Sequence, residues 1–358
     1  MICSQRSDGL GTRILSAVYA QLLSRHIDVP LRVFWTPLGW PDPPHSPVLM
    51  HPRYVLELFA SLHLFKDATK GPYADIVIHE EPVTTGLFSV FHNKDELFDL
   101  SESEVAQIAR MGNGINYDFP IPLFQFMAET TDLKAKVAHV AAQINWNPTI
   151  LEALAALDRR SPLSHCISVH VRRGDILDML LHSNLDILAD GLMIQILQRF
   201  MPLRGYFHAV DQHRSGSIIV CTEDQSVVAQ FRGRYGTERI VSCSDLPLSE
   251  NQRAAMDLLL LSRSQRIIAP VVSFFSQCAA SIGNVRLENT AWHLEETTDE
   301  IRQLLEETGC DRTKPVIAIM YSAAYLIALR NHLGSAERFK TLGLDLDPET
   351  FHRVTANS

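Results

Sequence analysis

Hydrophobic positions in the first half of the chain follow two periods, one typical of strands and one typical of helices. Short apolar runs predict buried strands at 1–5, 31–35 and 74–78. Between the first two runs, apolar residues at helical spacing predict an amphipathic helix: Ile14, Leu15, Val18, Leu22 and Leu23. The pattern also predicts helices at 53–62, 101–110 and 134–144 and a proline-rich loop at Pro37–Pro47.

The second half alternates more regularly between the two periods. After a predicted helix at 149–158, strands are predicted at 167–171, 217–221, 239–243 and 266–269. Each is followed by a predicted helix, at 186–200, 225–235, 250–263 and 274–282 respectively. This order indicates α/β units in which helices cover the faces of a doubly wound parallel sheet.

The segment Asn145–Pro148 interrupts the pattern and marks a predicted domain boundary. The length of 358 residues fits two domains of about 150 residues each. We predict a Rossmann-like domain on the acceptor side at 1–148, a second Rossmann-like domain that binds the donor at 149–300, and a helical tail at 301–358. The tail is expected to pack back on the first domain, and the two domains are expected to face each other across a cleft.

The balance of charges excludes one class of partner. Lysine and arginine together number 32 against 41 aspartates and glutamates, for a net charge of −9. An acidic chain lacks the basic face that a nucleic-acid backbone requires, so we expect no nucleic-acid partner. Recognition of a phosphate must therefore come from a local cluster of basic side chains.

Cysteine usage and hydropathy bear on the compartment. The six cysteines include no C-x-x-C pair, which argues against zinc and thioredoxin-like sites. Cys166, Cys221 and Cys243 lie in apolar strand-like runs and are predicted to be buried thiols in a reducing compartment. The N-terminus shows no signal-peptide pattern, and the apolar run Val316–Leu329 is shorter than the roughly 20 residues that span a bilayer. We therefore expect a cytoplasmic protein with at most peripheral membrane contact.

A glycine turn lies between the first predicted strand and the first predicted helix. Gly9 and Gly11 would let backbone N–H groups approach a phosphate, and the helix N-terminus adds the positive end of its dipole. The turn lacks the third glycine of G-x-G-x-x-G, and no acid ends the second strand as a NAD site requires. A glycine turn without a ligand is the alternative interpretation.

Charged residues also follow the predicted strand at 167–171. They are Arg172, Arg173 and Asp175, and His170 lies at the end of the strand itself. Open α/β sheets bind ligands at the carboxyl ends of their strands, and two guanidiniums there offer the bidentate, permanently charged donors that suit a diphosphate. The alternatives are an ion pair between Arg173 and Asp175, a solvated turn, or an exposed Arg-Gly-Asp tripeptide. We favour a donor that carries phosphate.

Other element ends carry further candidates. Thr222, Glu223 and Asp224 follow the strand at 217–221. Thr222 and Asp224 could cap the next helix, or the carboxylates could line the same crevice as Arg172. Asp257 places a carboxylate in an apolar helix, where it needs a partner or a ligand unless it lies on a solvated stripe. Ser273 and Phe274 open the helix that follows the strand at 266–269, where Ser273 could cap that helix and also bind an anion.

In this order the motifs resemble the fucosyltransferase superfamily, which includes bacterial nodulation α1,6-fucosyltransferases, the mammalian core α1,6-enzyme, α1,2-enzymes and protein O-fucosyltransferases. The family has a G-x-G turn, H-x-R-R-x-D, a strand ending in T-D-D or S-D, and a late D-x-x-x-x-S segment followed by S-F or S-S. Here the motifs stand as Gly9-Leu10-Gly11, His170 to Asp175, Thr222-Glu223-Asp224, and Asp257, Ser262, Ser273 and Phe274. The resemblance spans residues 1 to 285.

The resemblance implies a GT-B fold and an inverting glycosyltransferase. The enzyme would move fucose from GDP-fucose to a hydroxyl of a glycan or glycoconjugate, with no metal and no other cofactor. Arg172 would hold the β-phosphate and offset the charge of the leaving group, while Arg173 would assist the phosphates or orient Asp175.

The resemblance also implies roles for the remaining motif residues. His170 and Asp257 would recognise the guanine and its surroundings. Gly9 and Gly11 would close over the phosphates from the other domain. Contacts to the diphosphate would come from Ser273 and Phe274, and Thr222 and Asp224 would belong to the same donor site.

The chain departs from the family pattern at Glu223, where aspartate is commoner, and no motif marks the catalytic base. Asp8 is the candidate base because it adjoins the glycine turn, with Glu80 and Glu81 as others. The loops Pro37–Pro47 and Glu81–Asn93 are expected to select the acceptor. Three alternatives stay open: a transferase for another nucleotide sugar, a non-catalytic protein that binds sugar nucleotides or carbohydrates, and a Rossmann-type dehydrogenase.

Overall fold

The computed structural model describes residues 1–6, 9–37, 51–66, 75–78, 99–111, 114–117, 119–173, 201, 203–213, 216–270 and 273–290. In these ranges the chain forms two units. The first comprises Met1–Ser164, Cys243–Gln265 and Phe274–Arg286, and the second comprises the described parts of His165–Ser242, Arg266–Ser273 and the chain from Leu287. The predicted helix at 186–200, the predicted loop Glu81–Asn93 and the predicted tail at 301–358 lie outside the described residues, as does most of Pro37–Pro47.

The sheet of the first unit has four strands in the order β3-β2-β1-β4. They are β1 (Ile2–Arg6), β2 (Leu31–Trp35), β3 (Asp75–Ile78) and β4 (Ile115–Asn116). All three strand pairs are parallel, as the sequence predicts. Ile2 of β1 lies opposite Leu31 of β2 in the register. Parallel strands are covered on both faces, which accounts for the nearly continuous apolar sequence of β2.

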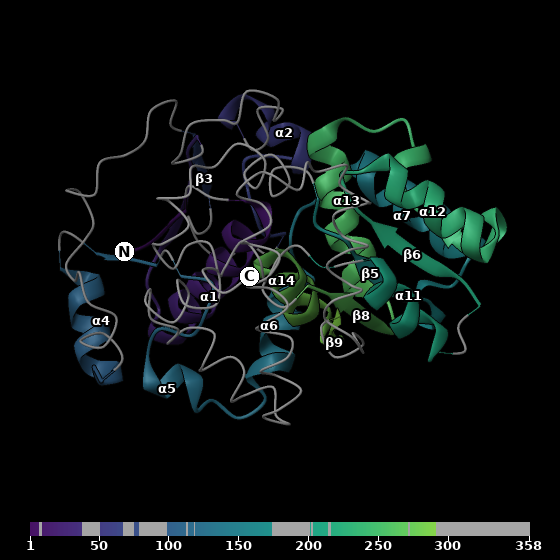
Figure 1. Cartoon of the computed structure of the whole chain (residues 1–358). Coiled ribbons are helices and arrows are strands. Elements are labelled where there is room, and N and C mark those ends of the chain that lie inside the picture. The colour runs from purple at the N-terminus through teal and green to yellow at the C-terminus, as the bar shows by residue number, and fades with distance from the viewer. Residues whose placement is uncertain are drawn as a thin grey trace, which may run out of the picture. The chain divides into compact units, whose positions relative to one another are not determined.

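Helices from distant parts of the sequence build the rest of the first unit. They are α1 (Leu10–Ile27), α2 (Val55–Leu58), α4 (Glu102–Arg110), α5 (Gln125–Ala128), α6 (Leu133–Ala141), α7 (Pro148–Arg160), α13 (Glu250–Arg263) and α14 (Phe274–Gly283). α14 packs against α1, α6 and α13 (Figure 1). Capping boxes fix two of the helix starts, with Ser101 at α4 and Ser249 at α13.

The sheet of the second unit has five strands in the order β7-β6-β5-β8-β9. They are β5 (Ile167–His170), β6 (Ile218–Cys221), β7 (Ile240–Val241), β8 (Arg266–Ala269) and β9 (Arg286–Asn289), and the helices of this unit are α11 (Leu203–Asp211) and α12 (Gln225–Tyr235). β5 pairs in parallel with β6 on one side and with β8 on the other. The strand order therefore reverses between β5 and β8, and such a switch point is where open α/β sheets bind ligands.

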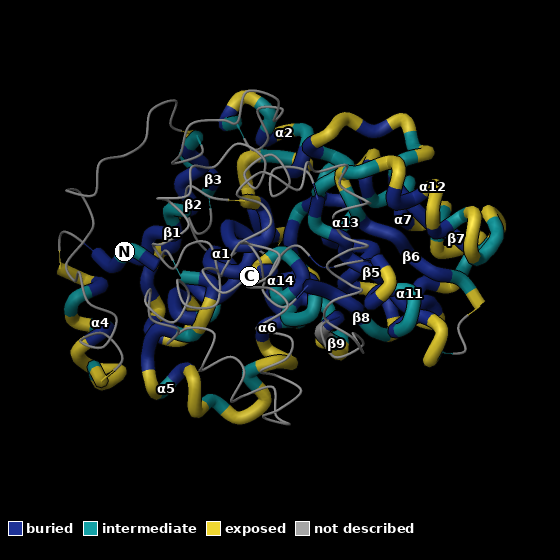
Figure 2. The backbone as a smooth tube through the Cα atoms, in the orientation of Figure 1, coloured by how far each residue is buried: buried dark blue, intermediate teal, exposed yellow. Residues whose placement is uncertain are grey.

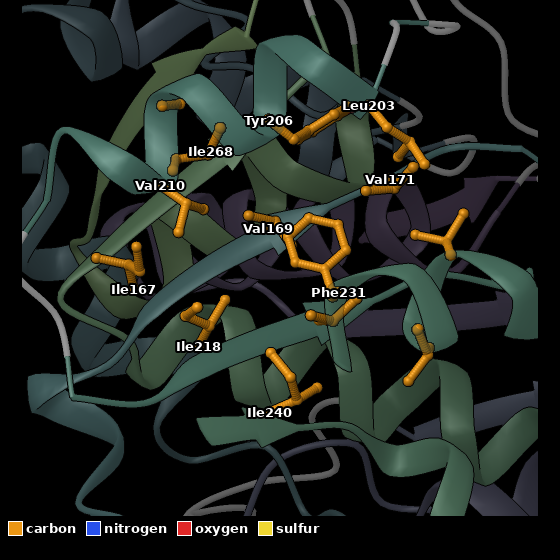
Figure 3. Packing of buried hydrophobic residues seen from close by; sticks show 14 of the residues in the cluster. Ile167, Val169, Val171, Leu203, Tyr206, Val210, Ile218, Phe231, Ile240 and Ile268 are labelled. Carbon is orange, nitrogen blue, oxygen red and sulfur yellow. The ribbon is translucent and has the colours of Figure 1, made fainter. Parts of the chain in front are cut away.

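An apolar cluster joins the strands and helices of the second unit. Ile167 and Val169 of β5 lie in one cluster with Tyr206 of α11 and Phe231 of α12. Figure 3 shows these side chains with those of the neighbouring strands. The helices of this unit therefore hold β5 through side chains that are almost wholly buried, and Figure 2 shows β5 and β6 as buried over their length.

Several predicted elements end earlier than the sequence pattern suggests. The predicted helix at 53–62 is wrong beyond Leu58, because Phe59 leaves the helix and forms an antiparallel bridge with Trp146. Helix α6 ends at Ala141 rather than at Ile144, because Ile144 bridges to Phe65. The predicted strand at 239–243 is reduced to β7, because a 3₁₀ turn begins at Cys243.

The structure also contains elements that the sequence pattern did not predict, namely β4, α5, α11 and β9. Cys166, Cys221 and Cys243 are free and buried, as predicted. Among the described residues, no helix combines the length and the hydropathy that crossing a lipid bilayer requires.

Candidate functional site

The candidate site lies where β5 leaves the second sheet. Backbone pairing between β5 and β8 reaches Val169 and Ile268, whereas pairing between β5 and β6 continues to His170 and Cys221. Beyond these residues Val171 N–H still donates to the carbonyl of Cys221 at 3.0 Å. β5 therefore stays joined to β6 for longer than to β8, and the residues after Val169 enter the switch point between β5 and β8.

His170 forms a buried contact across this switch point. Its side chain is 4% exposed, and its Nδ1 lies 3.3 Å from Oγ of Ser273, in the segment that follows β8. Burial, together with the positive charge of Arg172, lowers the pKa of His170 from 6.5 to about 3. His170 is therefore neutral at physiological pH, and it can take part in hydrogen bonds without adding a third positive charge.

Arg172 turns toward the end of the neighbouring strand. Its Nη1 lies 3.0 Å from Oε1 of Glu223, and the two side chains are 27% and 44% exposed. A pair this exposed contributes at most about 1 kcal/mol to stability, so its main effect is to orient the guanidinium. The sequence marks Glu223 as a departure from the family pattern and as a carboxylate that could line the same crevice as Arg172. Its contact with Arg172 depends on the pairing of β5 with β6 and has no local signal in the sequence.

Arg173 is buried, with 4% of its surface exposed. Its charge acts on the hydroxyl of Tyr206. Burial raises the pKa of this hydroxyl, and a hydrogen bond with Thr290 and the charge of Arg173 oppose the rise. Tyr206 also donates to the carbonyl of His170 at 3.0 Å. Asp175, the predicted partner of Arg173, lies outside the described residues.

Thr222 and Asp224 form a local capping structure after β6. Asp224 accepts a hydrogen bond from the backbone N–H of Ser226 at 2.8 Å and caps α12. Thr222 Oγ1 accepts from the N–H of Asp224 at 3.1 Å. The capping alternative is therefore confirmed for Asp224, and a contact of either residue with a donor stays a prediction.

The glycine turn contains two glycines with different surroundings. Gly9 is the N-cap of α1 in an extended conformation, and a Cβ placed on it would meet no atom within 4 Å. A Cβ on Gly11 would lie 2.7 Å from Cα of Phe275 in the first turn of α14. Gly11 therefore allows α1 and α14 to approach closely, a role in packing that the phosphate interpretation did not include. Asp8 lies outside the described residues.

Replacement of glycine by alanine should therefore affect stability much more at Gly11 than at Gly9. Gly11→Ala should lower the free energy of unfolding by about 1–3 kcal/mol, because overpacked helix contacts have to shift. Gly9→Ala should change it by less than about 1 kcal/mol, because its Cβ would meet open space. Urea unfolding of both variants measures the effect. Equal stabilities would contradict the packing role of Gly11.

The remaining predicted residues belong to the first unit. Asp257 lies in α13 and accepts a hydrogen bond from the thiol of Cys243. Burial raises the pKa of this thiol, and the neighbouring carboxylate raises it further, so Cys243 remains a protonated donor. Phe274 begins α14 and is 37% exposed. The partner of Asp257 is thus a thiol, and its predicted contact with guanine stays a prediction.

Six of the predicted site residues belong to the second unit: His170, Arg172, Arg173, Thr222, Asp224 and Ser273. Of these, His170 and Ser273 contact each other, and Arg172 contacts Glu223, which lies between Thr222 and Asp224. Gly9, Gly11, Asp257 and Phe274 belong to the first unit. In the part of the chain that the structure describes, no group of three or more histidine, cysteine, aspartate or glutamate side chains could hold a metal ion.

Comparison with known proteins gives matches among solved structures. No family model matches the chain, and no curated protein sequence matches it. The chain is similar to the fucosyltransferase NodZ from Bradyrhizobium, with 16% identity over 78% of this chain and 91% of that one and a TM-score of 0.45. It is also similar to POFUT1 in complex with GDP-fucose, with 12% identity over 80% of this chain and 97% of that one and a TM-score of 0.42.

Proposed function

We propose that this chain is a glycosyltransferase that moves fucose from GDP-fucose to a hydroxyl of a glycan or glycoconjugate. The observation that carries the proposal is the pair of arginines at the switch point of the second sheet. Arg173 is buried there and Arg172 is partly exposed. A buried guanidinium is costly unless charged or polar groups surround it, and a diphosphate is the ligand that a fork of two guanidiniums fits best.

The neighbours of the arginines suit the same ligand. Ser273 offers a hydroxyl beside His170, and the neutral imidazole supplies a hydrogen-bonding group without charge. The ends of two parallel strands, β5 and β8, thus provide two cations, one hydroxyl and one neutral ring. This combination favours a nucleoside diphosphate sugar over an uncharged ligand.

The proposed reaction is a direct displacement. The acceptor oxygen attacks the anomeric carbon of fucose, and the bond from this carbon to the β-phosphate oxygen breaks. The electron pair stays on the diphosphate, where Arg172 stabilises it, and the acceptor proton passes to a carboxylate base. Attack from the side opposite the leaving group inverts the configuration. Asp8 is the proposed base, with Glu80 and Glu81 as the other candidates.

The proposed reaction needs no metal ion, because the guanidinium of Arg172 supplies the positive charge. Before the donor arrives, Glu223 holds this guanidinium at 3.0 Å. The diphosphate would then share Arg172 with the carboxylate or replace it. We propose that this exchange aids the release of GDP, since a carboxylate that competes for Arg172 weakens the binding of the product.

Nucleotide binding provides the first test. We expect GDP to raise the melting temperature of the protein, while UDP, ADP and NAD do not. At about 100 times its Kd, a ligand stabilises the folded state by about 2.7 kcal/mol, which a thermal-shift titration detects readily. A shift with UDP would indicate another nucleotide sugar, and a shift with NAD alone would favour the dehydrogenase alternative.

Turnover provides the second arm of the same test. GDP-fucose incubated with a panel of glycan acceptors should release GDP, and EDTA should leave the rate unchanged. Loss of activity with EDTA would indicate a metal-dependent enzyme. Binding of GDP without transfer to any acceptor would favour the non-catalytic alternative.

A further inference from the structure

The parallel ladder between β5 and β8 stops for a reason that lies in the sequence. Val171 N–H points toward β6, so the carbonyl of the preceding residue, His170, points toward β8. In the register that pairs Val169 with Ile268, the next donor for this carbonyl would be the N–H of residue 270. Residue 270 is a proline, which has no N–H. The ladder therefore cannot continue.

Side-chain hydroxyls bind carbonyls at the ends of both strands. Tyr206 donates to the carbonyl of His170 at 3.0 Å, and Thr290 donates to the carbonyl of Ala269 at 2.6 Å. Tyr206 and Thr290 are both fully buried. A buried carbonyl without a donor is costly, so the hydroxyl of Tyr206 stabilises the separation of β5 from β8. The carbonyl of Ala269 faces away from β5, because carbonyls alternate along a strand and that of Ile268 faces β5. Thr290 therefore holds the end of β8 from its other side.

Tyr206 is tied to the arginine pair on one side and to the apolar core on the other. Its ring belongs to the cluster around Val169 and Phe231 (Figure 3). Its hydroxyl lies near both Thr290 and the charge of Arg173. The carbonyl that it binds belongs to His170, two residues before Arg172. A shift of this hydroxyl would therefore move the backbone from which both arginines project.

We propose that Tyr206 is a positioning residue for the donor site. Its hydroxyl replaces the N–H that Pro270 lacks, and it thereby sets the direction in which Arg172 and Arg173 leave β5. Thr290 binds the last carbonyl of β8, beyond which Ser273 lies. This inference rests on the proposed role of the arginines in binding a nucleoside diphosphate.

Tyr206→Phe tests the inference, with Tyr235→Phe as the matched control. The hydroxyl of Tyr235 also donates to a backbone carbonyl, that of Phe207 at 3.1 Å, and contacts Asp211 at 2.9 Å, but no predicted site residue takes part. Loss of one hydrogen bond from the positioning network should weaken GDP binding about fivefold to tenfold. Tyr235→Phe should change GDP binding by less than about twofold, although both variants lose a hydroxyl that donates to a backbone carbonyl.

Amide hydrogen exchange supplies a readout that does not depend on a ligand. Exchange of residues 167–173 should be faster in Tyr206→Phe than in Tyr235→Phe under conditions in which both variants are folded. Equal exchange and equal GDP affinity in the two variants would overturn the inference. Faster exchange in Tyr206→Phe, together with a wild-type protein that binds no GDP, would refute the donor assignment and leave the positioning of the arginines in place.

A second pair of variants keeps the test decisive if Tyr206→Phe does not fold. Thr290→Val removes the other hydroxyl with little change in volume, and Thr130→Val is its control, because Thr130 Oγ1 donates to the carbonyl of Phe126 at 2.9 Å. Faster amide exchange at 266–269 in Thr290→Val than in Thr130→Val is the expected result. Unchanged exchange there would overturn the role of the hydroxyls.

Discussion

Arg172→Ala is expected to abolish fucosyl transfer while the protein keeps its fold. The side chain of Arg172 is partly exposed and pairs with an exposed glutamate, so its removal should cost little stability. In the proposed reaction the same guanidinium meets the charge that develops on the departing diphosphate. Loss of one such donor typically costs about 2.7–4 kcal/mol of transition-state stabilisation, or about a hundredfold to thousandfold in rate.

The measurement compares turnover of GDP-fucose and melting temperature in three proteins: wild type, Arg172→Ala and Arg239→Ala. Arg239 is the matched control, because it lies in the same unit, is partly exposed as Arg172 is, and its Nε donates to the carbonyl of Gly216 at 2.9 Å. Arg239→Ala should keep nearly full activity. Turnover close to the wild-type rate in Arg172→Ala would end the phosphate role of this residue. Arg172→Lys should be intermediate, because lysine keeps the charge but loses the bidentate fork.

The helices that the sequence predicts well are those whose ends carry their own chemistry. The predicted helix at 250–263 agrees with α13 at both ends, and Ser249 closes a capping box at its start. The predicted helix at 225–235 agrees with α12, which begins at the cap formed by Asp224 and ends before Gly236. Local sequence suffices for these boundaries because the groups that satisfy the helix ends are neighbours in the chain.

The errors arise where tertiary contacts decide the structure. Phe59 and Ile144 continue apolar patterns that look helical, but each leaves its helix to form a bridge with a distant residue. Strand β4 has two residues, too few for a period to be recognised. Pairing with β1 stabilises it, and the sequence around Ile115 does not reveal that partner.

The same distinction applies to the candidate site. The placement of Arg172 and Arg173 at a strand exit was predictable, because the apolar run and the charged residues are adjacent in the sequence. The contact with Glu223 was not, because it depends on which strand lies beside β5. In the sequence Tyr206 looks like an ordinary core residue, and only the fold shows that its hydroxyl donates to the carbonyl of His170. Pro270 was the available signal, since a proline directly after a strand indicates a ladder that needs another donor.

The free energy of unfolding is expected to fall steeply as the pH is lowered from about 6.5 toward 3, and His170 should account for much of this loss. Burial holds the pKa of His170 at about 3 in the folded protein, against 6.5 for an exposed histidine. Between these two values the unfolded chain takes up a proton that the folded chain excludes. His170 therefore leaves the free energy of unfolding unchanged above pH 6.5. Below pH 6.5 its contribution lowers that free energy by about 1.4 kcal/mol per pH unit.

His170→Asn should remove this contribution, because asparagine does not titrate and can still form hydrogen bonds beside Ser273. Urea unfolding at pH 7.5 and at pH 5.0 measures it: the wild type should lose about 2 kcal/mol more than His170→Asn between the two pH values. His165→Asn is the control, since His165 is exposed in the same unit and its replacement should leave the wild-type loss nearly intact. Groups that titrate equally in all three proteins cancel in this comparison.

An equal loss in wild type and His170→Asn would show that His170 takes up a proton in the folded state. A neutral ring beside the two arginines would then be the wrong description of the site.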